Sequence, residues 1–103
     1  MANTVVGTPT LQNVTMTNAD TEYYADIPAG TFRFSLQTRD GTAFRIAFVT
    51  EKVATPTEPY LTIREGGAYN SPDGIQVGSS ALRVYLGCGT AAKVAEIITW
   101  PKA

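Results

Sequence analysis

Two neighbouring segments of the chain alternate apolar and polar residues on either side of a short turn. The first covers residues 31–39 and the second residues 42–48. Successive side chains of a β-strand point to opposite faces, so this alternation predicts two strands that each bury one face. The apolar positions on these two faces are Phe32, Phe34, Leu36, Phe44, Ile46 and Phe48.

The turn between the two strands determines which side chains would face each other in an antiparallel hairpin. A two-residue loop of Asp40 and Gly41 would set the apolar Phe44 opposite the polar Gln37. A three-residue loop that includes Arg39, with Gly41 in the left-handed conformation of a G1 bulge, keeps the apolar faces in phase. The predicted pairs are Phe32 with Phe48, Phe34 with Ile46, and Leu36 with Phe44.

Further short strands are predicted on both sides of this hairpin. They cover residues 11–17, 21–27, 60–65, 75–77 and 81–88, followed by a last strand that ends at Trp100. Strands at roughly 8–12-residue spacing with turn residues between them are typical of a β-sandwich or a jelly roll. We therefore expect an all-β fold, namely an antiparallel β-sandwich or jelly roll of about seven to eight strands.

One domain accounts for the whole chain of 103 residues. Residues 11–103 are expected to form the β-sandwich, in which Leu82, Val84 and Leu86 complete the core. Residues 1–10 end in Thr-Pro-Thr and are expected to form an N-terminal extended arm or an edge strand, because proline is tolerated at strand edges and starts.

The last strand has no purely polar face. Val94, Glu96, Ile98 and Trp100 fall on one side, and Ala95, Ile97 and Thr99 fall on the other. A β-bulge near Glu96 would resolve this conflict, and so would a neighbouring chain that covers the outer face. Both alternatives remain open at the level of the sequence.

The sequence offers little to catalysis. It contains no histidine, which removes the commonest general base and zinc ligand. Most of its nine Asp and Glu residues lie in predicted turns, and Glu22 and Asp26 are close to the far limit for a catalytic pair. Cys88 is in phase with Leu86 and is expected in the core. We therefore predict no catalytic residue, no metal, no cofactor and no enzymatic activity.

The charge distribution limits the partners. The net charge is −1, and the eight basic residues are dispersed singly along the chain. Binding to nucleic acid needs a basic stripe, so we expect no nucleic-acid partner. No stretch is long enough to span a membrane, and the first residues lack the features of a signal peptide. We expect synthesis in a cytoplasm, followed by retention there or exit within a larger assembly.

Several segments resemble small virion structural proteins of tailed bacteriophages. They are Tyr60–Ile63, Gly66–Tyr69, Leu82–Leu86, Val94–Trp100 and the stretch from Ala29 to Val49, and the likeness covers residues 28–100. By size, the chain is most similar to a capsid cement, or decoration, protein. The resemblance implies a small all-β module without an active site, often a trimer, that bridges capsomers on the capsid exterior after synthesis in the bacterial host cytoplasm.

The resemblance implies the major capsid protein or another virion protein as the partner, together with a homo-trimer. The candidate partner interface consists of Val5, Val6, Tyr24, Tyr69, Val94, Ile98, Trp100 and Pro101. The aromatic residues among them could instead close the ends of the sandwich. The alternatives are a phage tail, connector or head-fibre component, and a carbohydrate-binding β-sandwich module that stacks sugars on exposed aromatic residues.

Overall fold

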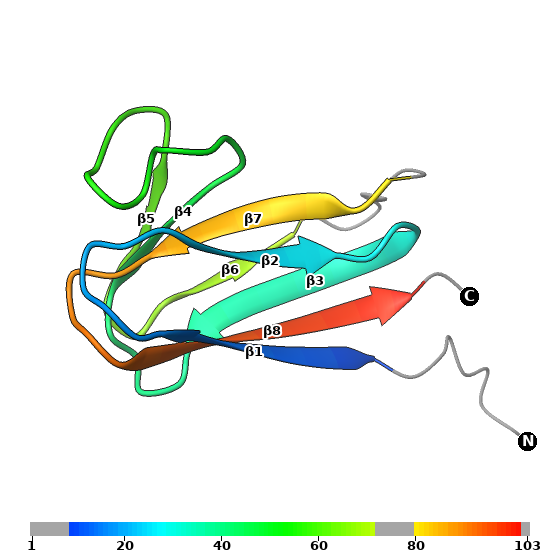
Figure 1. Ribbon diagram of the computed structural model, residues 1–103. Coiled ribbons are helices and arrows are strands. Elements are labelled where there is room, and N and C mark those ends of the chain that lie inside the picture. Colours follow the sequence, from blue (N-terminus) through cyan, green and yellow to red (C-terminus); the bar gives the residue numbers. More distant parts are fainter. Residues whose placement is uncertain (1–8, 72–79, 102–103) are drawn as a thin grey trace, which may run out of the picture.

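The computed structural model describes residues 9–71 and 80–101, and in these residues it contains eight strands and no helix (Figure 1). The strands form two four-stranded antiparallel sheets with the orders β1-β8-β3-β6 and β2-β7-β4-β5. Their bounds are β1 Thr10–Met16, β2 Tyr23–Ile27, β3 Thr31–Thr38, β4 Phe44–Ala47, β5 Leu61–Ile63, β6 Ala68–Asn70, β7 Leu82–Gly87 and β8 Lys93–Pro101. The prediction of an all-β sandwich is confirmed.

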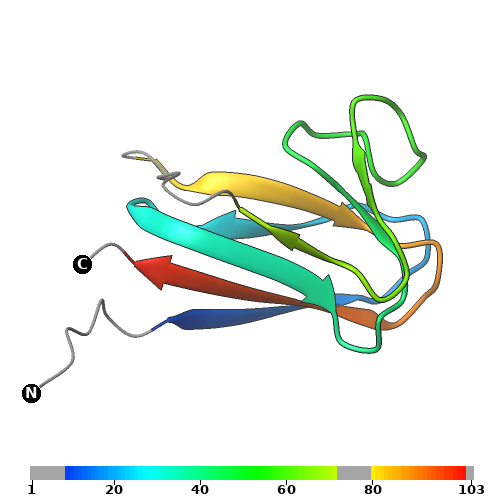
Figure 2. The same ribbon diagram turned by 180° about the vertical axis from the view of Figure 1, so that it is seen from behind.

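The connections follow the jelly-roll pattern. Apart from the β4–β5 connection, each step along the chain passes from one sheet to the other, and β8 returns to lie between β1 and β3 (Figures 1 and 2). Two sheets wound in this way form a sandwich with a single core between them. The jelly roll expected from the strand spacing is therefore the observed fold.

The predicted hairpin is wrong. Strand β3 pairs with β6 and β8, whereas β4 pairs with β5 and β7, so the two segments belong to different sheets. Gly41 has the predicted positive φ of 82°, but its turn carries the chain across the sandwich. An alternating pattern identifies the buried face of a strand and leaves its neighbour undetermined. The two phenylalanine-rich faces therefore belong to opposite walls of the core.

Most of the predicted core residues are buried. Phe34, Leu36, Phe44, Ile46, Val84 and Leu86 are each at most 2% exposed, and Leu82 is half-buried against them. Met16, Ile27, Ile97 and Cys88 are also buried in this cluster. The prediction that Cys88 is a core residue is confirmed.

Two predicted core residues lie elsewhere. Phe32 is only half-buried, because the pairing of β3 with β8 shifts register between Thr31 and Arg33 and the inward place goes to Thr31. Phe48 is 45% exposed, because β4 ends at Ala47 and the chain then leaves the sheet. The alternating pattern in the sequence thus shows neither the register shift in β3 nor the end of β4.

Two other predictions concern the sheet edges. Strand β6 forms where no strand was predicted, because Tyr69 pairs with the buried Leu36 and packs between the sheets. The predicted strand at residues 75–77 lies outside the described residues, as do residues 1–8 of the predicted arm. Thr10, the last residue of that arm, begins β1.

The segment that joins β4 to β5 (green, Figure 1) folds back over the outer face of its sheet. Val53 is fully buried there, and its carbonyl accepts a hydrogen bond of 2.8 Å from Nε of Arg45. Beside it, Gly87 leaves so little room that a Cβ atom would lie 2.6 Å from the carbonyl oxygen of Val53. A glycine at this position is what allows the segment to pack on β7.

An ion pair between Asp40 and Lys93 makes stability depend on pH. Their side chains lie 2.6 Å apart, and the hydrogen bond from Lys93, followed by those from Thr42, holds the pKa of Asp40 well below its usual range. A carboxyl pKa lowered by folding stabilises the fold above its unfolded value of about 4, and this contribution is lost as the pH falls. The same bond raises the pKa of Lys93, so the stability that the charged Lys93 contributes to the fold is lost at high pH.

We expect Asp40→Asn to lower the urea midpoint at pH 7, and the difference from the parent to shrink progressively as the pH falls below about 4. Asparagine keeps the Oδ1 acceptor for the Thr42 backbone N–H, so the change isolates the bond to Lys93. Glu58→Gln, which alters an exposed carboxylate in the segment between β4 and β5, serves as the control. If the difference in urea midpoint between the parent and Asp40→Asn stayed constant between pH 7 and pH 3, it would contradict a role for the ion pair.

Candidate functional site

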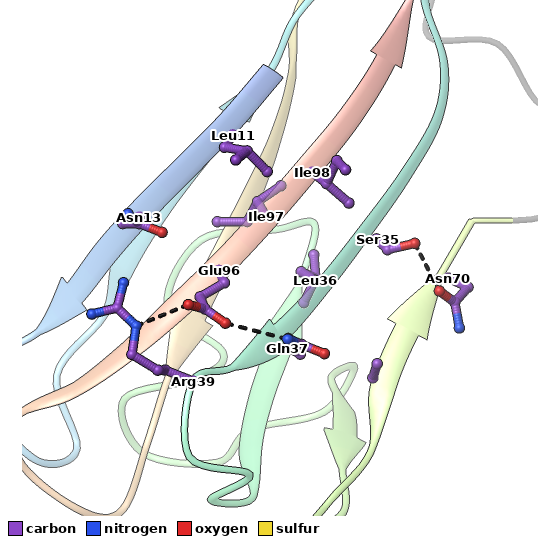
Figure 3. Close-up of a pocket in the computed structure, with 11 residues that line it drawn as sticks. Leu11, Asn13, Ser35, Leu36, Gln37, Arg39, Asn70, Glu96, Ile97 and Ile98 are labelled. Atoms are coloured by element: carbon purple, nitrogen blue, oxygen red, sulfur yellow. Dashed lines mark hydrogen bonds and ion pairs between the residues drawn. The ribbon is translucent and has the colours of Figure 1, made fainter. Parts of the chain in front are cut away.

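A shallow hollow of about 450 Å³ lies on the outer face of the β1-β8-β3-β6 sheet (Figure 3). Its lining comes from all four strands and from the turn after β3. The residues are Leu11, Asn13, Ser35, Leu36, Gln37, Arg39, Ala68, Asn70, Glu96, Ile97 and Ile98. This volume falls in the range of roughly 300–1,000 Å³ that is usual for small-ligand sites.

The hollow is lined by two adjacent rows of side chains that point outward. The cross-strand register determines which residues share a row. The first row runs Leu11, Ile98, Ser35 and Asn70 across the four strands. The second row runs Asn13, Glu96, Gln37 and Ala68. Ser35 and Ala68 carry the shortest side chains of these two rows.

Hydrogen bonds hold the polar side chains of the hollow in place (Figure 3). Nε of Arg39 donates to Oε2 of Glu96 at 2.8 Å, and Nε2 of Gln37 donates to Oε1 at 3.2 Å. The bond from Arg39 first, and that from Gln37 second, lower the pKa of Glu96. A carboxyl group with a lowered pKa is ionised at neutral pH, so Glu96 is poorly suited to donate a proton.

The other wall of the hollow combines a hydroxyl and an amide. Oγ of Ser35 donates to Oδ1 of Asn70 at 2.7 Å, which bridges the central strand β3 to the edge strand β6. At the opposite edge the hollow is apolar, because Leu11 is 72% exposed and lies across from Ile98. The site therefore has a polar side and an apolar side, and its geometry is suited to binding.

The sequence left open why the last strand has an apolar residue on each face, and the structure excludes one explanation. Strand β8 pairs with β1 in unbroken register from Lys93 to Thr99, so no bulge lies near Glu96. The bulge lies in β3 instead. Glu96 occupies the outer face with Arg39 as its partner. The other explanation, a neighbouring chain over this face, stays a prediction.

The predicted interface residues that the structure describes do not form one continuous surface. Val94, Ile98 and Trp100 share the outer face of β8, and Trp100 is 38% exposed. Tyr24 lies on the other sheet, where Cζ of Arg83 is 3.9 Å from the centroid of its ring.

Tyr69 packs between the sheets against Phe34 and Phe48, with ring centroids 5.8 and 6.5 Å away. Pro101 ends β8. Val5 and Val6 lie outside the described residues.

Sequence reasoning missed the polar half of the hollow. Ser35 and Gln37 were assigned to an outward face, but nothing in the sequence placed them beside Asn13, Asn70 or Glu96. Their positions depend on which strands pair and in which register. The alternation within 31–38 and 93–101 gives the outward phase of each strand, and only the sheet order brings these strands together.

Within residues 9–71 and 80–101, no three His, Cys, Asp or Glu side chains converge in a way that could hold a metal ion. The same residues contain no helix with the length and apolar character needed to cross a membrane.

Comparison with known proteins supports the fold. A scan against protein-family models found no match, and a search of curated proteins found none either. Among solved structures, the chain is similar to the solution NMR structure of a de novo designed double-stranded β-helix. The TM-score is 0.51 at 16% sequence identity, over 90% of this chain and 97% of that one. At this identity the likeness shows an all-β, jelly-roll-type architecture and nothing about function.

Proposed function

We propose that the protein is a non-enzymatic structural protein of a bacteriophage virion, of the capsid cement type. In this role it binds the major capsid protein on the capsid exterior and stabilises the lattice, as a homo-trimer. The observation that supports this proposal is the outer edge of strand β1. A cement protein needs a rigid scaffold with an edge to which a neighbouring chain can add a strand.

Within residues 9–71 and 80–101, strand β1 is a long edge strand that lacks the usual protection. Its seven residues contain no charge and no proline, and its register with β8 is regular. Natural proteins protect exposed edges with charges, prolines, bulges or short strands. The other edge strands follow this rule, since β5 and β6 have three residues each and β2 carries the Asp26–Arg83 ion pair.

The β1 edge is also firmly positioned. Nε2 of Gln12 donates a 2.8 Å hydrogen bond to the carbonyl oxygen of Asp26, which ties β1 to β2 of the opposite sheet. Leu11 stands exposed beside this edge and adds apolar area next to a strand that would pair there. A rigid, uncharged edge with an adjacent apolar side chain favours the addition of a partner strand over a loose surface contact.

The test is co-sedimentation with heads assembled from the major capsid protein encoded in the same genome. We expect the parent protein to sediment with the heads, and Thr15→Lys, a charge on the β1 edge, to bind at least about tenfold more weakly. Thr62→Lys places the same charge on the edge strand β5 and should bind like the parent. If the parent fails to bind, or if both variants bind equally well, the proposal is overturned. Light scattering checks the trimer separately.

A further inference from the structure

We infer that the hollow on the outer face of the β1-β8-β3-β6 sheet is a binding site for a neutral oligosaccharide. The site goes beyond the proposed capsid role and does not depend on it. Four properties of the hollow carry the inference: its charge balance, its hydrogen-bonding groups, its apolar border and the way its polar side chains are held.

The charge balance selects a neutral ligand. Among the described residues that line the hollow, the charged ones are Arg39 and Glu96, and they form a 2.8 Å ion pair with each other. A phosphate or a carboxylate ligand would have to compete with Glu96 for Arg39, and a cation would have to compete with Arg39 for Glu96. A neutral ligand can bind beside this pair without breaking it.

The hydrogen-bonding groups match sugar hydroxyls. The bond from Ser35 occupies the amide oxygen of Asn70 and leaves its amide nitrogen for a ligand. The bond to Glu96 occupies the amide nitrogen of Gln37 and leaves its amide oxygen. The hollow also includes the exposed side-chain amide of Asn13. A hydroxyl group both donates and accepts, so a polyhydroxylated ligand can use donors and acceptors that lie side by side.

The apolar border gives a sugar ring a surface for its C–H groups. Leu11 and Ile98 are neighbours across β1 and β8 and lie within the hollow. Trp100 follows Ile98 on the same face of β8, about 6.8 Å further along the strand. A ligand that occupies the hollow and also reaches the indole of Trp100 must extend over more than one ring. An oligosaccharide therefore fits better than a monosaccharide.

The polar groups are held in place before a ligand arrives. The Arg39–Glu96–Gln37 network and the Ser35–Asn70 bond restrain side chains that would otherwise lose rotamer freedom on binding. Except for Arg39, which lies in the turn after β3, these residues stand on β-strands, and β8 and β3 are the central strands of their sheet. Restraint of this kind lowers the entropic cost of binding a flexible, hydrated ligand.

The test is an NMR titration of the isotope-labelled protein with a panel of neutral hexasaccharides: cello-, malto-, xylo-, manno- and N-acetylchitohexaose. We expect at least one of them to give saturable shifts, confined to the strands around the hollow and to the side-chain amides of Asn13, Gln37 and Asn70. Gln37→Ala and Asn70→Ala should each weaken that binding about tenfold or more. Asn18→Ala, an exposed amide in the β1–β2 turn, should leave it unchanged.

Trp100→Ala separates a site of several rings from a single-ring site. It should weaken the hexasaccharide about tenfold and the matching disaccharide much less, because the shorter ligand does not reach the indole. The inference is overturned if no member of the panel gives saturable shifts at about 10 mM. It is also overturned if the shifts centre on another surface, such as Tyr24, or if the hollow is covered by a second copy of the chain. Capsid co-sedimentation does not bear on this result, so either proposal can fail alone.

Discussion

Phe34→Ala is expected to lower the free energy of unfolding by about 3–5 kcal/mol, the usual cost of deleting a buried phenylalanine side chain. The Phe34 side chain is 2% exposed and packs on Tyr69 with a centroid distance of 5.8 Å. Its backbone is fixed on both sides by Ser71, which accepts from its N–H at 2.8 Å and donates to its carbonyl at 2.9 Å. The site can therefore collapse little around the cavity. Urea unfolding followed by circular dichroism measures the loss.

Phe48→Ala is the matched control. The predicted hairpin would place both phenylalanines in the core, but Phe48 is 45% exposed and touches the same Tyr69 only at 6.5 Å between centroids. We expect its removal to cost under about 1 kcal/mol, because most of its surface already faces water. Equal losses for the two variants would contradict the exposed position of Phe48 beyond the end of β4.

Gly87→Ala is expected to destabilise the protein by about 1–3 kcal/mol, the usual cost of inserting a methyl group into packed structure. The new Cβ would lie 2.6 Å from the carbonyl oxygen and 3.0 Å from the carbonyl carbon of Val53. Both are backbone atoms, so relief requires the whole segment between β4 and β5 to shift. That shift would stretch the hydrogen bond that Val53 accepts from Arg45.

Gly89→Ala tests the same exchange two positions away, where the nearest atom, Oδ1 of Asp20, is at an ordinary contact distance of 3.9 Å. We expect this variant to be within about 0.5 kcal/mol of the parent. Limited proteolysis adds a local readout, since cleavage within residues 48–60 should become faster in Gly87→Ala and stay unchanged in Gly89→Ala. Unchanged stability and proteolysis in Gly87→Ala would contradict the packing of Val53 on β7.

The alternation along the chain predicted the architecture and most inward positions, because burial of one strand face is a local property of the sequence. Phe34, Leu36, Phe44 and Ile46 are buried as the pattern requires. The same pattern could not identify strand partners, since a hairpin and a crossing between sheets bury the same residues. It also could not show that Phe48 lies beyond the end of β4.

The hollow was harder to predict than the core, because its residues are neighbours only through cross-strand register. Asn13 and Glu96 face each other across β1 and β8, and Gln37 faces Glu96 across β8 and β3. Each is an ordinary outward polar residue in its own strand. Their convergence follows from the sheet order, which no local pattern contains. The phage resemblance and the trimer stay predictions for the experiments described above.

The position of β8 has a consequence for how the protein acquires its fold. Strand β8 is the last strand in the described part of the sequence, yet it lies between β1 and β3. Thr10 of β1 pairs with Thr99 of β8. Its sheet therefore cannot assemble until nearly all of these residues are available, and closing so long a loop is entropically costly. Topologies dominated by such distant pairings fold slowly, on the scale of milliseconds to seconds. During synthesis on the ribosome, the edges of β1 and β3 that pair with β8 stay unpaired until β8 has been synthesised. A nascent chain is most prone to misassembly while such edges are unpaired.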